Sequence, residues 1–391
     1  MAIWHLLTPE FPPAGRGVAD YTRHVARGLA EAGDAVHVWC PPVGAVEPSD
    51  GVTVHQELGS IGPADLRRVG RALDRFPRPR HLLVQWVPHG FGYRSMNLPF
   101  CIWLWWRSVR HDDRVEIMVH EPYLAFWENA WRHAVIALVH RLMTVVLLRA
   151  TRQVWVAIPA WESYWRPYAL GRRVAFTWLP IPSSLPACRE PSAAAVTRDR
   201  YVSRGGLLVG TFGTYGPAVS ALLLDLVPPL MKTRLEPAVL FVGDGSEAFA
   251  HRLREAHPEL AGRIHATGAV RAADLDAYLA ACDLLVEPYP DGISSRRTSA
   301  MAGLSLGRPI VSTRGRLTEA VWDERGAVLL ADVGDRATWV QQVERLLGDP
   351  AERQRLGSRG HRLYEERFDL RHTVDALRSA HSTHPLEGRA S

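Results

Sequence analysis

Short apolar runs alternate with stretches of helical periodicity along the whole chain, and this alternation limits the possible folds more than any other feature. The chain opens on an apolar strand at residues 3–7, and the apolar positions that follow recur at helical spacing: Val18, Tyr21, Val25 and Leu29. Residues 35–40 predict the next strand and complete a β-α-β unit. Such alternation predicts parallel sheets with helices on both faces.

The alternation occurs in two series, separated by residues 180–206, which are rich in Pro, Ser, Ala and Arg. Further strands of the first series are expected at residues 82–87, 115–120, 154–158 and 174–179. Strands of the second series are expected at residues 207–212, 238–242, 264–267, 284–287, 310–312 and 327–330. A chain of 391 residues is also too long for one ordinary domain.

The predicted fold is therefore α/β, with two facing, doubly wound parallel-sheet domains of the Rossmann type. Residues 1–185 are expected to form the N-terminal domain, residues 186–205 an interdomain linker and residues 206–368 the C-terminal domain. Residues 369–391 predict a last helix and a tail that pack back toward the N-terminal domain. Because ligands of such sheets bind at the carboxyl ends of the strands, we expect the chemistry there.

Composition narrows the ligand and the compartment. The net charge is +5, but Lys232 is the only lysine, so an anion must be bound by arginine, by protonated histidine or by this one lysine. The four cysteines form no C-x-x-C pair, which gives no support for a metal or disulfide framework and indicates a reducing cytoplasm. No basic segment followed by a cleavable apolar stretch opens the sequence, and the apolar residues 134–150 predict a core helix.

The segment from Pro290 to Ser299 predicts an anion site. It joins the apolar strand 284–287 to a helix and carries an Asp-Gly turn, serines and the arginine pair Arg296-Arg297. Backbone N–H groups of residues 294–297 are expected to be unpaired at the start of the helix and to face an anion. The alternative is a capped turn with solvated arginines, but arginine in a first helical turn opposes the helix dipole unless an anion or carboxylate is close.

In the order of its motifs the chain resembles the GT-B glycosyltransferases, and most closely the retaining family 4. The resemblance covers nearly the whole chain and rests on these motifs: H-L-L-T-P-E-F-P-P with G-R-G-V-A-D-Y at residues 5–21, V-H-E at 119–121, F-V-G-D-G at 241–245 and G-A-V at 268–270. It implies that the N-terminal domain takes the acceptor and the C-terminal domain a nucleotide-sugar donor. Departure of a diphosphate needs cations and N–H groups, which the segment 290–299 can supply.

The resemblance also implies roles for individual residues. His120 and Asp291 are the candidate catalytic residues, with His120 directed at the donor sugar. The candidate donor-binding residues are Gly15, Gly17, Gly213, Thr214, Gly243, Ala269, Val270, Gly292, Ser294, Ser295, Arg296, Arg297, Thr298 and Ser299. The candidate acceptor-side residues are Asp20, Tyr21, Glu121, Phe91 and Tyr93. Asp20 and Glu121 can equally be a helix-face charge and a turn residue, and Gly15 to Gly17 a plain strand-to-helix turn.

Two departures from the family pattern stand out. The family has two glutamates eight residues apart, whereas counting from Asp291 places Ser299 at the second position. Alignment on Gly307-Arg308-Pro309 would instead place the pair at Ser294 and Ala302, and we prefer the first register because it keeps the acid. The arginine and lysine that the family places after the first strand of its second domain are missing from residues 210–216, so Arg296 and Arg297 are expected to replace them.

Aromatic residues concentrate between Trp86 and Trp178, and core packing accounts for most of them. If the aromatic and basic segment 103–110 is exposed, a lipid-linked acceptor and peripheral contact with the inner face of the membrane are favoured; if it is buried, a soluble acceptor is favoured. Residues 89–93 are expected to be a loop that contacts the acceptor.

The sequence thus predicts a cytoplasmic retaining glycosyltransferase that moves a sugar from a nucleotide diphosphate sugar to a hydroxyl acceptor. No cofactor and no metal site is expected, since no clear Asp-x-Asp arrangement to hold a metal on the diphosphate is found and Asp112-Asp113 resembles a surface turn. A nucleotide-sugar epimerase of the same architecture and a non-catalytic binding protein remain alternatives. A nicotinamide-dependent oxidoreductase is disfavoured because the first β-α turn lacks G-x-G-x-x-G. No nucleic-acid partner is expected.

Overall fold

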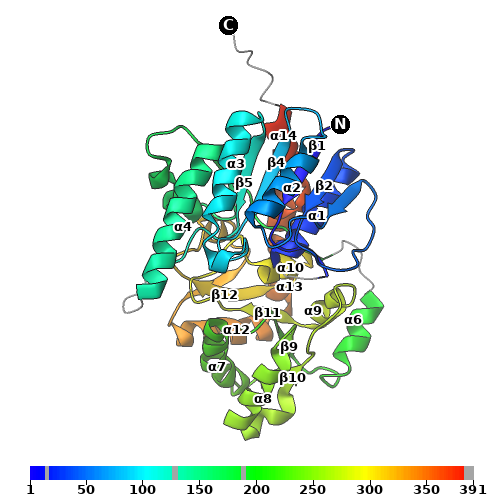
Figure 1. Ribbon diagram of the computed structural model, residues 1–391. Coiled ribbons are helices and arrows are strands. Elements are labelled where there is room, and N and C mark those ends of the chain that lie inside the picture. The colour runs from blue at the N-terminus through cyan, green and yellow to red at the C-terminus, as the bar shows by residue number, and fades with distance from the viewer. Residues whose placement is uncertain (14–16, 126–130, 186–190, 383–391) are drawn as a thin grey trace. The chain divides into compact units, whose positions relative to one another are not determined.

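The computed structural model describes residues 1–13, 17–125, 131–185 and 191–382. The chain divides into two compact units, Met1–Ile181 with Leu370–Ser391, and Pro182–Asp369. Each unit is built on one fully parallel sheet with helices against it (Figure 1). The predicted α/β class, with two doubly wound parallel sheets, is therefore confirmed.

The first unit has a seven-stranded sheet of order β3-β2-β1-β4-β5-β6-β7. Its strands are β1 (Ile3–Leu7), β2 (Ala35–Trp39), β3 (Val52–His55), β4 (His81–Trp86), β5 (Arg114–Val119), β6 (Thr151–Val156) and β7 (Ala175–Trp178). Its helices are α1 (Gly17–Glu31), α2 (Pro63–Leu73), α3 (Leu98–Arg110), α4 (Trp131–Ala150), α5 (Ala160–Trp165) and α14 (Leu370–Ser382), with short 3-10 turns at Tyr93–Ser95 and Arg166–Ala169.

The second unit has a six-stranded sheet of order β10-β9-β8-β11-β12-β13. Its strands are β8 (Leu208–Phe212), β9 (Ala238–Val242), β10 (Ile264–Ala266), β11 (Leu284–Glu287), β12 (Ile310–Arg314) and β13 (Leu329–Asp332). Its helices are α6 (Pro191–Arg198), α7 (Pro217–Met231), α8 (Ser246–Ala256), α9 (Leu275–Ala281), α10 (Thr298–Ser305), α11 (Val321–Arg325), α12 (Arg336–Gly348) and α13 (Pro350–Leu363). A 3-10 turn spans Pro258–Arg263, and a π-helical turn spans Tyr364–Phe368.

Continuous apolar strands place the core of each unit on both faces of its sheet. All six residues of β4 and all five of β9 are buried. In the second unit, Val209, Phe241 and Leu284 from three neighbouring strands pack with residues of α7, α8 and α12 in one apolar core. Strands buried on both faces are typical of parallel sheets.

The C-terminal helix α14 belongs to the first unit and packs against α1. Gly28 permits the close approach, because a Cβ atom at this position would lie 2.8 Å from Cγ2 of Val374. Arg378 adds an ion pair to the buried Asp34, with Nε 3.2 Å from Oδ2.

Part of the segment 186–205 forms the helix α6, where only a linker was expected, and that expectation is wrong for residues 191–198. The helix packs against α9 and lies within the second unit. Arg198 binds it there, since its guanidinium lies 2.8 Å from Oδ2 of Asp283 and donates to the carbonyl of Ala281. The composition of this segment predicts a linker, because the pairing of Arg198 with the distant Asp283 cannot be inferred from the sequence.

Candidate active site

The order of strands in the second unit defines a switch point between β8 and β11. From this point the chain builds β9 and β10 on one side and β12 and β13 on the other. The segments that leave the carboxyl ends of β8 and β11 therefore diverge, and in open α/β sheets ligands bind in the crevice that such divergence creates. The backbone N–H of Phe212 donates to Oε1 of Glu287 over 2.8 Å and ties the two strand ends together.

The segment after β11 follows a path that requires glycine at one position. Gly292 has a φ of 85°, and a Cβ atom there would lie 2.2 Å from Oγ1 of Thr318 and 2.3 Å from the backbone nitrogen of Gly315. The neighbouring backbone is fixed to β12 and to the turn that follows it, since Ile293 donates to Thr313 and Leu317 donates to Asp291, each over 2.9 Å. The Asp-Gly turn predicted from the sequence is thus a rigid part of the site.

Asp291 holds both arginines of this segment. Nη2 of Arg296 lies 2.6 Å from Oδ2 of Asp291, and Arg297 pairs with the other carboxylate oxygen. Burial opposes ionisation of Asp291, but Arg297 and Arg296 together lower the pKa of its carboxyl below the ordinary value. The three side chains are about one-fifth exposed, and they leave one net positive charge at the start of α10.

Two aspects of this segment differ from the expectation of unpaired N–H groups. The N–H of Ser295 donates to Oε1 of Glu319 over 2.9 Å, and the N–H of Arg297 donates to the carbonyl of Ser294. Ser294 and Ser295 are fully buried, and the hydroxyl of Ser294 has no partner among the described residues. The carboxyl of half-buried Glu319, whose pKa is raised by desolvation, therefore occupies the position where an anion was expected next to Ser295.

Ser299 lies in a hydroxyl and carboxyl cluster that the sequence analysis missed. Its Oγ atom lies 2.7 Å from the hydroxyl of Tyr289, which donates to Oε2 of Glu287 over 3.1 Å. Burial raises the pKa of Glu287 to about 7. The guanidinium of Arg297 stacks over the Tyr289 ring at 4.5 Å and connects the cluster to the arginine pair. The position of Glu287 at the carboxyl end of a buried strand was the available signal.

The other glycine turns of the second unit lie at the same edge of the sheet. Gly243 has a φ of 111°, and a Cβ atom there would lie 2.4 Å from the carbonyl oxygen of Gly213, so the turns after β8 and β9 touch. Thr214 and Ala269 are exposed beside these turns, and Val270 is half-buried. Half-buried Thr298 begins α10. The structure thus brings Gly213, Thr214 and Gly243 to the edge that carries the segment 290–299.

His120 follows β5 in the first unit and is held firmly. Its Nε2 atom lies 2.9 Å from Oε1 of Gln85, its carbonyl accepts from the indole of Trp161, and its ring meets that of Tyr21 edge-on at 4.8 Å. Burial lowers the pKa of His120 to about 3 and raises that of Tyr21, so both rings are neutral at physiological pH. Of the residues predicted in this unit, His120 and Tyr21 are brought together.

The other predicted residues of the first unit are dispersed. Asp20 pairs with Arg23 one turn along α1, at 3.1 Å, which matches the helix-face alternative. Glu121 and Tyr93 are exposed. Phe91 was expected in an acceptor loop, but it is fully buried between Trp86 and Phe100, with ring centroids 5.3 and 4.6 Å away, and this expectation is wrong. Gly17 is exposed at the start of α1, and Gly15 lies outside the described residues.

Within the described ranges, no group of three or more His, Cys, Asp or Glu side chains could hold a metal ion. Asp113, half of the pair expected in a surface turn, is instead buried between Arg80 and Arg107. A cavity of about 750 Å³ in the second unit lies at the amino ends of its strands, where Arg198 and Arg353 both pair with Asp283. Ligands of parallel sheets bind at the carboxyl ends of the strands, so the position of this cavity at the opposite edge argues against a donor site there.

Residues 206–349 match the family model described as glycosyl transferases group 1. This range contains the switch point, the arginine pair and the Glu287 cluster. The chain has the GT-B architecture, and the family match in its second unit is to glycosyltransferases. None of the curated proteins compared with the chain matches it in sequence.

Solved structures of GT-B enzymes match over almost the full chain. Sucrose-phosphate synthase from Thermosynechococcus elongatus matches with a TM-score of 0.74 and 16% identity, covering 98% of both chains. Anabaena HepE in complex with UDP matches with a TM-score of 0.70 and 16% identity, covering 98% of this chain and 100% of its own. An α,α-trehalose-phosphate synthase from Burkholderia xenovorans matches with a TM-score of 0.66 and 13% identity, covering 96% and 99%. At these identities the likeness shows the shared fold.

Proposed function

We propose that the chain is a cytoplasmic, retaining family 4 glycosyltransferase that moves a sugar from a nucleotide diphosphate sugar to a hydroxyl acceptor without a cofactor or bound metal. The observation that carries the proposal is the Asp291-bound pair of Arg296 and Arg297 at the start of α10, inside the region matched by the family. HepE has been solved with UDP and with UDP-glucose, so we take a uridine diphosphate sugar as the first donor to test.

The arginine pair suits the leaving group. When the anomeric C–O bond breaks, negative charge grows on the diphosphate, and guanidiniums already fixed in space stabilise that charge with little reorganisation. Asp291 orients Arg296 and Arg297 through one carboxylate oxygen each. Asp291 thereby supports the donor site by positioning the two cations.

The turns at the same edge suit the rest of the donor. Gly213 and Gly243 offer backbone without side chains, which permits close approach of a phosphate or ribose. The hydroxyls of Thr214 and Ser299 can bind ribose or phosphate oxygens. Neutral His120, directed at the donor sugar by resemblance to the family, can exchange hydrogen bonds with a sugar hydroxyl without adding charge.

The test is UDP binding by calorimetry to the full-length protein and to Arg296→Ala/Arg297→Ala. Each charged hydrogen bond contributes about 1.5–3 kcal/mol, so the double variant should bind UDP at least about a hundredfold more weakly. The matched control is Arg325→Ala/Arg336→Ala, which removes two arginines of surface ion pairs in the same unit and should leave UDP affinity unchanged. Equal UDP affinity in both double variants would refute the proposed donor site.

Product analysis separates the alternatives. Incubation with a UDP-sugar and a mixture of hydroxyl acceptors should give a glycoside whose anomeric configuration, read from proton coupling constants, equals that of the donor. An inverted product would refute retention. A changed sugar released without any acceptor would identify an epimerase, and UDP binding with no turnover would identify a binding protein.

A further inference from the structure

Large apolar side chains are exposed on two neighbouring helices of the first unit, α3 and α4. Eight of the thirteen exposed large hydrophobic residues in the described part of the chain lie on these helices, and each is 43% to 74% exposed. We call these residues the outer apolar face: Ile102, Trp105, Trp106, Val109, Trp131, Val135, Leu138 and Leu142. A single exposed leucine needs no explanation, but a contiguous apolar patch of this size marks a binding surface.

The spacing shows that the face is a second stripe on each helix. On α3 the exposed residues follow i, i+3, i+4 and i+7 from Ile102, and on α4 they follow i, i+4, i+7 and i+11 from Trp131. The two helices contact each other along the flank of the unit (Figure 1). The stripes therefore lie on adjacent helices and point away from the sheet.

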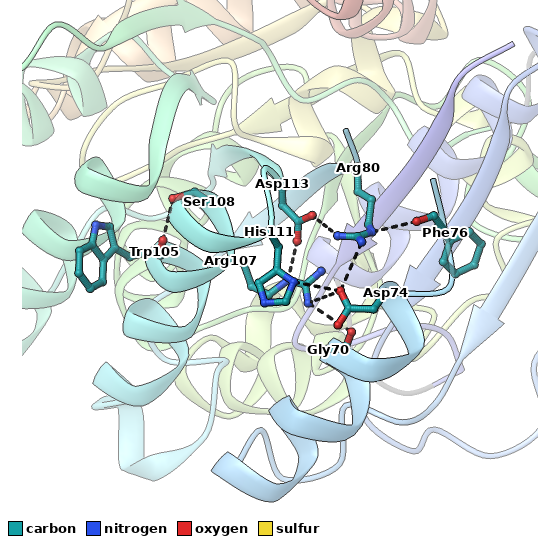
Figure 2. Close-up of polar contacts among 9 residues, drawn as sticks. All are labelled: Gly70, Asp74, Phe76, Arg80, Trp105, Arg107, Ser108, His111 and Asp113. Atoms are coloured by element: carbon teal, nitrogen blue, oxygen red, sulfur yellow. Dashed lines mark hydrogen bonds and ion pairs between the residues drawn. The ribbon is translucent and has the colours of Figure 1, made fainter. Parts of the chain in front are cut away.

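The inner side of α3 is anchored by a buried ion network. Nε of Arg107 lies 2.5 Å from Oδ2 of Asp113 and its Nη1 lies 3.0 Å from Oδ1 of Asp74, while Arg80 joins both carboxylates. Figure 2 shows these charges converging on one side of α3 while Trp105 points to the opposite side. The exposed tryptophans are thus presented by a helix that cannot rotate to bury them without exposing a fully buried arginine.

The inner side of α4 is anchored as well. His140 is buried, with Nε2 2.7 Å from the carbonyl of Ser95, and Thr144 is buried one turn later. By length and composition alone α4 is the one helix among the described residues that could cross a membrane, with a mean hydropathy of 1.5. Because 39% of this stretch is buried in the fold, the expectation of a core helix holds for one side only, and the helix is suited to lie on a membrane surface.

The charges on the two helices have one sign. Neither Leu98–Arg110 nor Trp131–Ala150 contains an aspartate or a glutamate. Arg110 and Arg132 are exposed on these helices, and Arg94 is exposed in the turn before α3. Tryptophan beside arginine, on helices that contain no acid, matches the interface of an anionic bilayer, where indole rings lie at the headgroups and cations meet lipid phosphates.

We propose that the outer apolar face docks the enzyme on the surface of an anionic lipid bilayer. Both helices start at the carboxyl edge of the sheet, since α3 follows β4 and α4 follows β5. The docked face thus reaches the edge at which His120 and Tyr21 lie. Resting on the proposed function, this placement favours an acceptor carried by a lipid, whose sugar-accepting hydroxyl enters from the membrane.

The experiment is cosedimentation of the full-length protein with vesicles of phosphatidylcholine alone, or of phosphatidylcholine and phosphatidylglycerol in equal parts. The wild type should bind the anionic vesicles, and Trp105→Ser/Trp106→Ser should reduce the partition coefficient at least about tenfold. Arg110→Gln/Arg132→Gln should reduce it about tenfold or more on anionic vesicles and little on neutral ones.

A matched set of valines controls for loss of surface hydrophobicity in general. Val109→Ser/Val135→Ser removes two residues of the face, 59% and 45% exposed, whereas Val196→Ser/Val333→Ser removes two that are 59% and 40% exposed in the second unit. Only the first pair should weaken vesicle binding. Because all four side chains are exposed, both variants should unfold at the wild-type temperature.

Three outcomes would overturn the proposal: no binding of the wild type to anionic vesicles, equal effects of the two valine pairs, or a dimer that Trp105→Ser/Trp106→Ser dissociates while wild-type vesicle binding is absent. The last result would assign the face to a second copy of the chain. UDP binding measured without vesicles should be the same in all these variants, so a failure of docking is distinguishable from a failure of the proposed donor site.

Discussion

Replacing Glu287 with glutamine should remove a pH-dependent loss of stability from the second unit. This carboxyl is 3% exposed, and burial raises its pKa from an ordinary value of 4.5 to about 7. Glutamine has nearly the same shape, and its amide can still accept from the N–H of Phe212 and donate to the hydroxyl of Tyr289. The substitution therefore changes the titration of the site while preserving its packing.

The sign of this pH dependence follows from comparing the protonation of Glu287 in the folded and the unfolded protein. Below pH 4.5 Glu287 is protonated in both states and contributes no pH dependence. As the pH rises from 4.5 to about 7, the unfolded chain loses this proton while the folded protein keeps it, so the folded state loses stability. The gap between the two pKa values corresponds to about 3 kcal/mol, fully expressed above pH 7.

The assay is urea unfolding of wild type and Glu287→Gln at about pH 4.5 and about pH 8. The free-energy difference between the two proteins should shift by about 3 kcal/mol in favour of the variant at the higher pH, and this comparison cancels all other titrating groups. Glu116, in the first unit, has its pKa raised to about 7 in the same way, so Glu116→Gln should shift the stability of that unit instead. A pH-independent difference, or one favouring the wild type at high pH, would refute the reasoning.

Two further substitutions test the positioning of the site and of the outer apolar face. Gly292→Ala places a methyl group at a backbone φ of 85° and 2.2 Å from Oγ1 of Thr318, so it should weaken UDP binding at least about tenfold. The control Gly262→Ala, where nothing lies within 4 Å of the added methyl group, should leave UDP binding unchanged. Calorimetry with UDP on both variants tests this prediction. Arg107→Ala leaves Asp113 buried with one cation fewer, so the free energy of unfolding of the first unit, measured in urea, should fall by about 3–5 kcal/mol while UDP affinity stays unchanged. A fall below about 1 kcal/mol would show that the ion network contributes little to stability.

The strands could be predicted wherever burial on both faces makes them continuously apolar. The sequence predicts β9 and β11 with their observed bounds. The edge strand β3 was missed because three of its four residues are only half-buried and the fourth is exposed, so its pattern is not that of a core strand. The helix α6 was missed because its stability depends on Arg198 reaching a carboxylate 85 residues away.

The site could be predicted to the extent that topology alone locates it. Turns at the carboxyl ends of parallel strands meet at one edge whatever their sequence, and this rule places Gly213, Gly243 and Gly292 correctly at that edge. Side-chain pairing could not be predicted, because the contact of Glu319 with Ser295 depends on the exact course of a turn 24 residues further along the chain. Phe91 was placed on the surface because a short glycine-rich loop gives no sign of the aromatic stack that buries it.

The departure at Ser299 has a physical reason in the cluster around it. The family resemblance leads one to expect glutamate at this position, but Ser299 and Tyr289 bond beside the carboxyl of Glu287, which is already buried. A second carboxylate there would face the first in a site that scarcely tolerates one, since Glu287 already titrates near pH 7. We therefore expect the two positions to be coupled, because the buried acid on β11 disfavours a second acid at the start of α10. Introducing glutamate at position 299 should accordingly require Glu287→Gln in the same protein.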